Sequence, residues 1–123
     1  MTETDRELLE LAAKSYGPEI EWDGDGWVIT SKVKGHLTNY EAWNPLIDDG
    51  DALRLTVKLG IEPKKPSRAR SVGTVVQAWY PPDGNPNRSA CAHVSEHVRN
   101  GDRLEATRRA IVRAAAEIGR IMS

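Results

Sequence analysis

Cysteine and phenylalanine are scarce in this sequence: its 123 residues include one cysteine, Cys91, and no phenylalanine. A single cysteine excludes an internal disulfide and a zinc site built from cysteines alone, and it is typical of a reducing cytoplasm. No apolar run reaches the roughly 18 residues of a membrane-spanning helix. The first seven residues are acidic and polar, unlike a signal peptide. We therefore expect a cytoplasmic protein that does not bind membranes.

An excess of one charge sign is also missing. Lysine and arginine number 17 and aspartate and glutamate 18, so the net charge is −1 with neutral histidines. This balance argues against general binding to polyanions, although it allows a local basic patch. The sequence has no P-loop, no G-x-G-x-x-G and no G-x-S-x-G pattern, and we expect no cofactor. A chain of this length predicts one domain, residues 1–123.

Three segments have the pattern of helices. Apolar residues recur every three to four positions over about 4–16, 49–59 and 102–121. Each segment begins at a polar residue whose side chain can accept a hydrogen bond from the first turn. These candidate caps are Thr4, Asp48 or Asp49, and Asp102.

The same spacing predicts which faces of the last two helices are buried. In the second helix we expect Leu53 and Val57 on the buried face, with Leu55 and Leu59 beside them. In the third helix the predicted apolar face consists of Leu104, Ile111, Ala114, Ala115, Ile118 and Ile121.

Between the helices, β-prone residues predict short strands. A hairpin is expected over residues 20–30, where glycines in an Asp-Gly-Asp-Gly turn separate two apolar stretches. Strands are also predicted at 72–80 and 89–98, paired antiparallel. The stretches 31–45 and 62–70 are expected to be an irregular connection and an exposed loop. Three helices and a few antiparallel strands predict an α+β domain with layered packing.

Three segments resemble one known family, the phage ABA-sandwich domain family of small phage and prophage proteins. They are residues 7–14, 43–55 and 106–117. The resemblance implies an α-β-α sandwich with a small, mainly antiparallel sheet of about four strands. It also implies a phage origin. It implies no established activity and supplies no catalytic residue.

Residues 93–97, His-Val-Ser-Glu-His, match the H-x-x-E-H pattern of inverted zinc proteases. That chemistry requires a helix that turns both histidines toward one metal, with Glu96 as the general base. The segment alternates like a strand, in which His93 and His97 lie about 13 Å apart, too far to share an ion. We expect ordinary surface histidines and keep a zinc-dependent hydrolase at His93, Glu96 and His97 as a remote alternative.

Two acidic clusters could hold a cation: Asp23 and Asp25, and a second group of Asp48, Asp49 and Asp51. A calcium loop of the EF-hand type needs a glutamate twelve residues from the first ligand, and neither cluster has one. Turn and helix-cap chemistry is the expected role of both clusters, and ion binding is left open.

A basic stretch consists of Lys64, Lys65, Arg68 and Arg70, and it is suited to meet phosphates. Tryptophans, which can stack on bases, occur at positions 22, 27, 43 and 79. No known nucleic-acid-binding motif accompanies them. We expect a solvated basic loop, and tryptophans that serve the core or an interface. We expect Cys91 to be a small buried thiol rather than a nucleophile.

The segment Trp43-Asn44-Pro45-Leu46 is predicted to be structural. Pro45 restricts its own φ and favours an extended residue before it. Trp43 or Leu46 then lies close enough to the cap to set the angle at which the chain enters the second helix. We expect this segment, together with Asp48, Asp49 and Asp51, to dock that helix onto the sheet.

The leading functional hypothesis is a non-enzymatic phage protein that binds a host or phage macromolecule in the bacterial cytoplasm. Its motivation is the family resemblance together with the missing catalytic motifs. The partner is expected to be a protein rather than a nucleic acid, and a homodimer is left open. The alternative is a nucleic-acid-binding protein that uses the basic stretch 64–70.

Overall fold

The computed structural model describes residues 4–69 and 73–122. Its α+β class is confirmed, and the three helices lie where the sequence predicts them. In chain order the elements are α1 (Asp5–Tyr16), β1 (Ile20–Trp22), β2 (Trp27–Val33), β3 (His36–Ala42), α2 (Asp49–Leu59), β4 (Glu62–Pro63), β5 (Ser67–Ala69), β6 (Gly73–Tyr80), β7 (Ala92–His97) and α3 (Arg103–Ile121).

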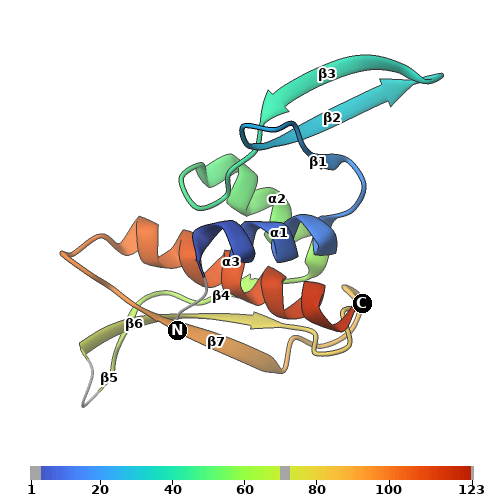
Figure 1. The fold of residues 1–123 in the computed structure, drawn as a ribbon. Coiled ribbons are helices and arrows are strands. Elements are labelled where there is room, and N and C mark those ends of the chain that lie inside the picture. Colours follow the sequence, from blue (N-terminus) through green and yellow to red (C-terminus); the bar gives the residue numbers. More distant parts are fainter. Residues whose placement is uncertain (1–3, 70–72, 123) are drawn as a thin grey trace.

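The strands form two antiparallel sheets. One has the order β1-β2-β3. In the other, β6 is central and pairs with β4, β5 and β7. The helices lie between the two sheets, with β1–β3 above them and β4–β7 below (Figure 1). The molecule is therefore an α+β sandwich whose helices form the middle layer, unlike the α-β-α order that the family resemblance implies.

The predicted caps determine where the helices begin. Each cap side chain accepts a hydrogen bond from the amide three residues later, in the pairs Thr4–Glu7, Asp48–Asp51 and Asp102–Glu105. Helix α2 ends at Gly60, whose φ of 72° lies in the left-handed region that favours glycine. Within the described ranges, no helix is long and apolar enough to cross a membrane.

The predicted hairpin at residues 20–30 is confirmed as the β1–β2 pair. The prediction of an irregular connection over 31–45 is wrong, because β2 continues to Val33 and β3 pairs antiparallel with it. Leu37 and Tyr40 of β3 are both about half exposed. The β3 side chains that the structure describes are all exposed, so they do not show the alternation of buried and exposed residues by which a strand is recognised in a sequence.

The second predicted pair of strands is also confirmed, as β6 and β7 in antiparallel register. The expected loop at 62–70 is partly wrong, because it contains the short strands β4 and β5, which pair with β6. Two or three residues are enough for such pairing but too few for a sequence pattern.

Helix α3 lies at the centre of the core. It packs against α1 on one side and the β4–β7 sheet on the other (Figure 1). Small residues allow this close packing: Ala106, Ala110, Ala114, Ala115, Ala116 and Gly119 are buried. The prediction that Leu104 and Ile121 belong to the buried face is wrong, because both are exposed near the helix ends.

Candidate functional site

The residues of the H-x-x-E-H pattern lie on strand β7. His93 and His97 are exposed, whereas Glu96 is buried and accepts a hydrogen bond from Arg113 at 2.7 Å. Neighbouring positions on a strand face opposite ways, so Glu96 does not share a face with the histidines. The helical arrangement that the zinc pattern needs is thus not formed. Within residues 4–69 and 73–122, no three His, Cys, Asp or Glu side chains could hold a metal ion together.

Cys91 is exposed, so the prediction of a buried thiol is wrong. It precedes β7 and lies outside the strand, where no alternation determines its burial. The His93 ring stacks on the ring of Trp79 with centroids 4.6 Å apart. The Trp79 indole N–H donates to the side-chain oxygen of Gln77. The Trp79 and His93 rings thus stack on each other across the β6–β7 pair.

The acidic residues are used in turns and helix caps. Asp23 Oδ1 accepts hydrogen bonds from the amides of Asp25 and Gly26, and its Oδ2 accepts one from the Tyr40 hydroxyl at 2.6 Å. The hydrogen bond from Tyr40 is the main cause that lowers the pKa of Asp23. The same bond raises the pKa of Tyr40. This carboxylate thus accepts three hydrogen bonds from within the β1–β3 region.

In the basic stretch, Lys64 and Lys65 lie in the link between β4 and β5, and Arg68 lies on β5. The Lys64 amide donates to the Gln77 carbonyl and so continues the β4–β6 pairing. The Lys64 ammonium lies 3.6 Å from the Glu62 carboxylate. Lys65 and Arg68 are exposed. Arg70 lies outside the described residues. A solvated basic surface therefore runs along one side of the second sheet.

Trp43 is 1% exposed and joins the core between the hairpin and the helices. Its amide donates to the Trp27 carbonyl, and its ring lies 6.3 Å from that of Tyr16 on α1. Asn44 Oδ1 accepts from the Leu46 amide, and Pro45 is fully buried. The segment thus connects β3 to α2 across the core.

Asp51 completes this connection from the first turn of α2. Its carboxylate accepts from the Asn44 amide at 2.9 Å and from Arg54 at 2.8 Å. Burial raises the pKa of Asp51, and the hydrogen bond from the Asn44 amide acts in the opposite direction. The acidic cluster of residues 48–51 is therefore occupied by capping and by this link.

An apolar groove lies between α2 and α3, and we call it the α2–α3 groove. Its volume is about 330 Å³, and it is lined by Asp49, Ala52, Leu53, Thr56, Pro63, Leu104, Thr107, Arg108 and Ile111. Leu53 is 62% exposed, Val57 77% and Leu104 63%. The prediction that Leu53 and Val57 are buried is therefore wrong. The core instead takes the adjacent face of α2, with Ala52, Leu55, Thr56 and Leu59.

A bridging arginine fixes the entrance of the groove. Arg108 on α3 donates through Nε to the Leu46 carbonyl and through a terminal nitrogen to Asp49, both at 2.9 Å. It thereby ties α3 to the start of α2. Ile47, beside this bridge, is 75% exposed. The groove thus has apolar walls and a rim with one acidic and one basic side chain.

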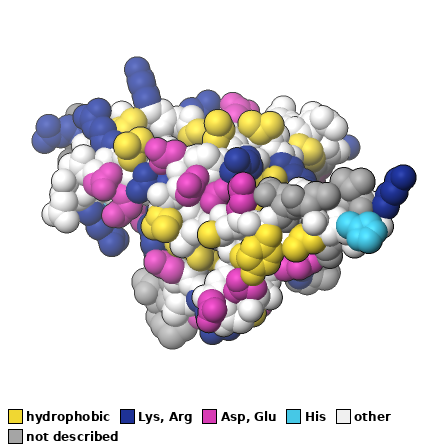
Figure 2. All heavy atoms as spheres, turned by 90° about the horizontal axis from the view of Figure 1, so that it is seen from above, with side chains coloured by type: hydrophobic (Ala, Val, Ile, Leu, Met, Phe, Trp, Pro, Cys, Tyr) yellow, Lys and Arg dark blue, Asp and Glu magenta, His cyan; other side chains and the backbone are white. Residues whose placement is uncertain are grey.

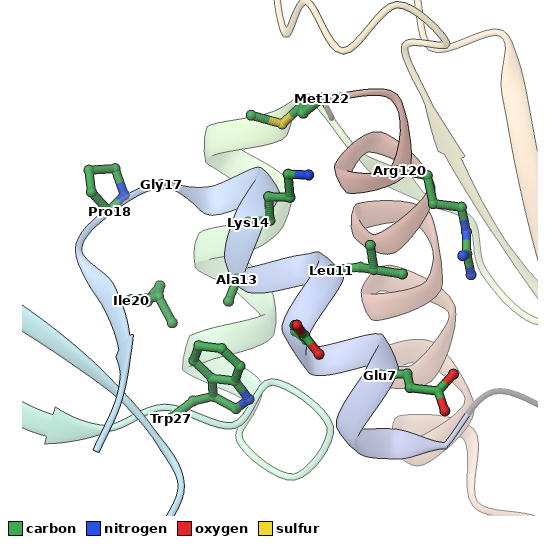
Figure 3. A pocket seen from close by; sticks show the side chains of 11 residues that line it. Glu7, Leu11, Ala13, Lys14, Gly17, Pro18, Ile20, Trp27, Arg120 and Met122 are labelled. Carbon is green, nitrogen blue, oxygen red and sulfur yellow. The ribbon is translucent and has the colours of Figure 1, made fainter. Parts of the chain in front are cut away.

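A larger concave region lies around α1, with a volume of about 740 Å³. Its lining side chains do not converge on one point. Trp27 and Ile20 lie on one flank of α1, and Leu11 and Arg120 lie on the other (Figure 3). On the face seen from above, apolar side chains form small patches separated by charged ones (Figure 2). Neither feature has the form of a substrate pocket.

Sequence reasoning placed Leu53, Val57 and Leu104 in the core because their spacing is that of a buried helix face. One signal for the groove was present: α2 has two adjacent apolar rows, and a short helix packed on one side buries only one.

No known protein family, curated protein or solved structure matches this chain.

Proposed function

We propose that this protein is non-enzymatic and binds a partner protein, whose apolar helix face occupies the α2–α3 groove. The observation that carries this proposal is that two large apolar side chains lining the groove, Leu53 and Leu104, are exposed, and that Val57, one turn further along α2, is exposed as well. Single exposed apolar residues are ordinary on protein surfaces, whereas a contiguous group marks an interaction site.

The shape and chemistry of the groove favour a helix as its occupant. Two helices form its long walls, and Pro63 of β4 lies between them. Leu53 and Val57 stand one turn apart, as apolar residues do on helices that pack against a partner. Asp49 and Arg108 at the rim carry opposite charges, so they can contact polar residues that flank the apolar stripe of a partner helix. Phosphate groups would find few donors in these walls, so a nucleic acid is the poorer fit.

The proposal includes a biological setting. Residues 43–55 resemble the phage ABA-sandwich family, and they include the start of the groove wall on α2. We therefore place the protein among phage or prophage proteins that act in the cytoplasm of an infected or lysogenic bacterium. The missing catalytic motifs support a role in binding rather than turnover.

Charge-introducing variants test the groove. Leu53→Glu and Val57→Glu alter exposed side chains, so circular dichroism should show an unchanged fold. Leu37→Glu is the matched control, because Leu37 is similarly exposed but lies on β3. A partner captured from bacterial lysate is identified and purified, and its affinity is measured by calorimetry. We expect the groove variants to bind about tenfold more weakly or worse, and the control to bind normally.

Two results would contradict the proposal. Equal affinity of all the variants would show that the partner binds elsewhere. A wild-type dimer that becomes a monomer in Leu53→Glu, measured by light scattering, would assign the groove to a second copy of this chain.

A second candidate function, binding of single-stranded nucleic acid, is favoured by the Trp79–His93 stack. This stack lies on the face of the second sheet that is turned away from α3, and Lys64 lies on the neighbouring strand segment. Bases stack on such exposed aromatic surfaces. Binding in a gel-shift assay should then weaken with salt and fall in Trp79→Ala. Unchanged affinity when residues 64, 65, 68 and 70 are all alanine would exclude this function.

A further inference from the structure

A second pocket, separate from the α2–α3 groove, lies where β7 meets α3 and α1. Its volume is about 520 Å³, within the roughly 300–1,000 Å³ range of small-molecule sites. Its lining residues are Leu8, Ser95, Glu96, His97, Arg99, Arg109 and Arg113. The groove uses positions 104, 107, 108 and 111 of α3, whereas this pocket uses 109 and 113. The two features therefore lie on different faces of the same helix.

Cations predominate in this pocket. Three arginines line it, against the single carboxylate of Glu96. Asp5, near the start of α1, accepts a further hydrogen bond from Arg109 at 2.8 Å. The arginines still outnumber the two carboxylates, so the pocket suits an anion.

Glu96 holds two of the guanidinium groups in place. Its side chain is buried, and its two oxygens lie 2.7 Å from Arg113 and 3.6 Å from Arg109. Arg113 uses the same terminal nitrogen for Glu96 and for the Ser95 carbonyl. A guanidinium has five N–H donors in a fixed plane, so each arginine keeps donors beyond these protein contacts. The buried carboxylate thus prearranges donors at the pocket wall.

The backbone of β7 adds two donors. Alternate residues of an antiparallel strand turn their N–H and C=O groups toward the same neighbour. The Val98 amide donates to the Thr74 carbonyl of the adjacent β6 segment, so even-numbered positions face β6. The N–H groups of Ser95 and His97 therefore point to the other edge of β7, away from β6. The Ser95 carbonyl points the same way, because it accepts a hydrogen bond from Arg113. That edge borders the pocket.

We infer that this pocket binds a phosphate monoester of a small molecule. The phosphoryl oxygens would accept hydrogen bonds from Arg109, Arg113 and the edge amides, since guanidinium groups match phosphate geometry well. Arg99 also lines the pocket and is exposed, so its positive charge adds attraction for the dianion. The volume exceeds what a phosphate ion alone requires and leaves room for the group esterified to it.

Titration followed by ¹H–¹⁵N NMR tests this site on the full chain. The probes are inorganic phosphate, O-phosphoserine as a monoester, and serine as the comparison that lacks the phosphate. We expect O-phosphoserine to bind most tightly and to shift the amides of Ser95 and His97. If inorganic phosphate shifts these amides and O-phosphoserine does not, the site binds the free ion, and the monoester assignment is overturned. Shifts spread over all basic residues would show unspecific charge attraction.

Variants separate the pocket from general basicity. Arg99→Gln should weaken O-phosphoserine binding about fivefold to tenfold, and Arg113→Gln should weaken it further. The matched control is Arg88→Gln, because Arg88 is exposed and pairs with Asp83 in the turn before β7. The Arg99 side chain is exposed and lies between β7 and α3, outside both elements, so its variant stays informative if Arg113→Gln is unstable. Equal affinity of Arg99→Gln and the wild type, or an equal loss in the control, would overturn the inference.

Discussion

Gly119 of α3 lies directly against the backbone of Leu11 on α1. A Cβ atom added at Gly119 would come within 2.9 Å of the Leu11 carbonyl carbon and still closer to its oxygen. These atoms belong to a helix backbone and cannot move aside as a flexible side chain can. The contact therefore sets how closely the first and last helices pack.

The first prediction is that Gly119→Ala destabilises the protein. Alanine normally stabilises a helix interior by about 1 kcal/mol relative to glycine. Here the added methyl group clashes with the α1 backbone, and such overpacking costs about 1–3 kcal/mol. We expect a net loss in the free energy of unfolding, measured by urea denaturation. Gly26→Ala is the control, since an added Cβ there meets nothing within 4 Å, and it should change stability little. A more stable Gly119→Ala would show that the helices can separate without cost.

The second prediction concerns Trp43→Ala. Trp43 is buried between the hairpin and α1, and truncation of such a side chain costs about 3–5 kcal/mol. We expect a large fall in the melting temperature. Trp22→Ala is the control. Trp22 is 42% exposed, so its truncation should lower the melting temperature much less. A melting temperature of Trp43→Ala within a degree or two of the wild type would exclude a core role for this residue.

The third prediction follows from the hydrogen bond between Tyr40 and Asp23. The negative carboxylate raises the pKa of Tyr40 above its ordinary value of about 10. This contact stabilises the hairpin below the unfolded pKa of tyrosine, and the stabilisation is lost as the pH rises through the folded pKa. In Asp23→Asn we expect the pKa of Tyr40 to fall toward its ordinary value, measured by NMR of the ring carbons.

Tyr80 provides the internal control for that titration. Its pKa is also raised, but mainly by burial, and Glu117 is the second cause. Asp23→Asn should therefore leave the pKa of Tyr80 unchanged. Equal falls for Tyr40 and Tyr80 would indicate a general change in the fold, and no fall at Tyr40 would contradict the hydrogen bond.

The fourth prediction is that Glu96→Ala destabilises the junction of β7 and α3. Removal of this buried carboxylate leaves Arg109 and Arg113 without their shared partner. The arginines are partly exposed, so water offsets part of the loss, and we expect about 1–3 kcal/mol. Glu117→Ala is the control, because its ion pair with Arg120 is well exposed and contributes little. Equal denaturation midpoints for the two variants would contradict a structural role for Glu96.

The three helices and the paired strands could be predicted because their signals are local. Thr4, Asp48 and Asp102 each act on residues within one helical turn, so the cap and the helix are visible in the same short stretch. Strand β3 was not predicted because it forms by pairing with β2, while those of its side chains that the structure describes are exposed.

The candidate sites were harder to predict, because they depend on contacts between distant parts of the chain. Nothing near Glu96 in the sequence indicates that Arg109 and Arg113 will surround it. Leu53 has the spacing of a core residue, and only the packing of α2 against α3 shows that the neighbouring row is buried instead. The local sequence pattern predicts the helices and strands, whereas which of their faces become buried depends on how they pack in the folded protein.

The pairing of α1 with α3 also has a consequence for how the chain acquires its structure. Leu11 and Gly119 are separated by more than a hundred residues, so their contact must close a very long loop. Contacts of such high sequence separation slow folding. During synthesis, the apolar face of α1 cannot pack against α3 until nearly the whole chain has left the ribosome. The nascent protein therefore presents this face to chaperones and other chains until α3 arrives.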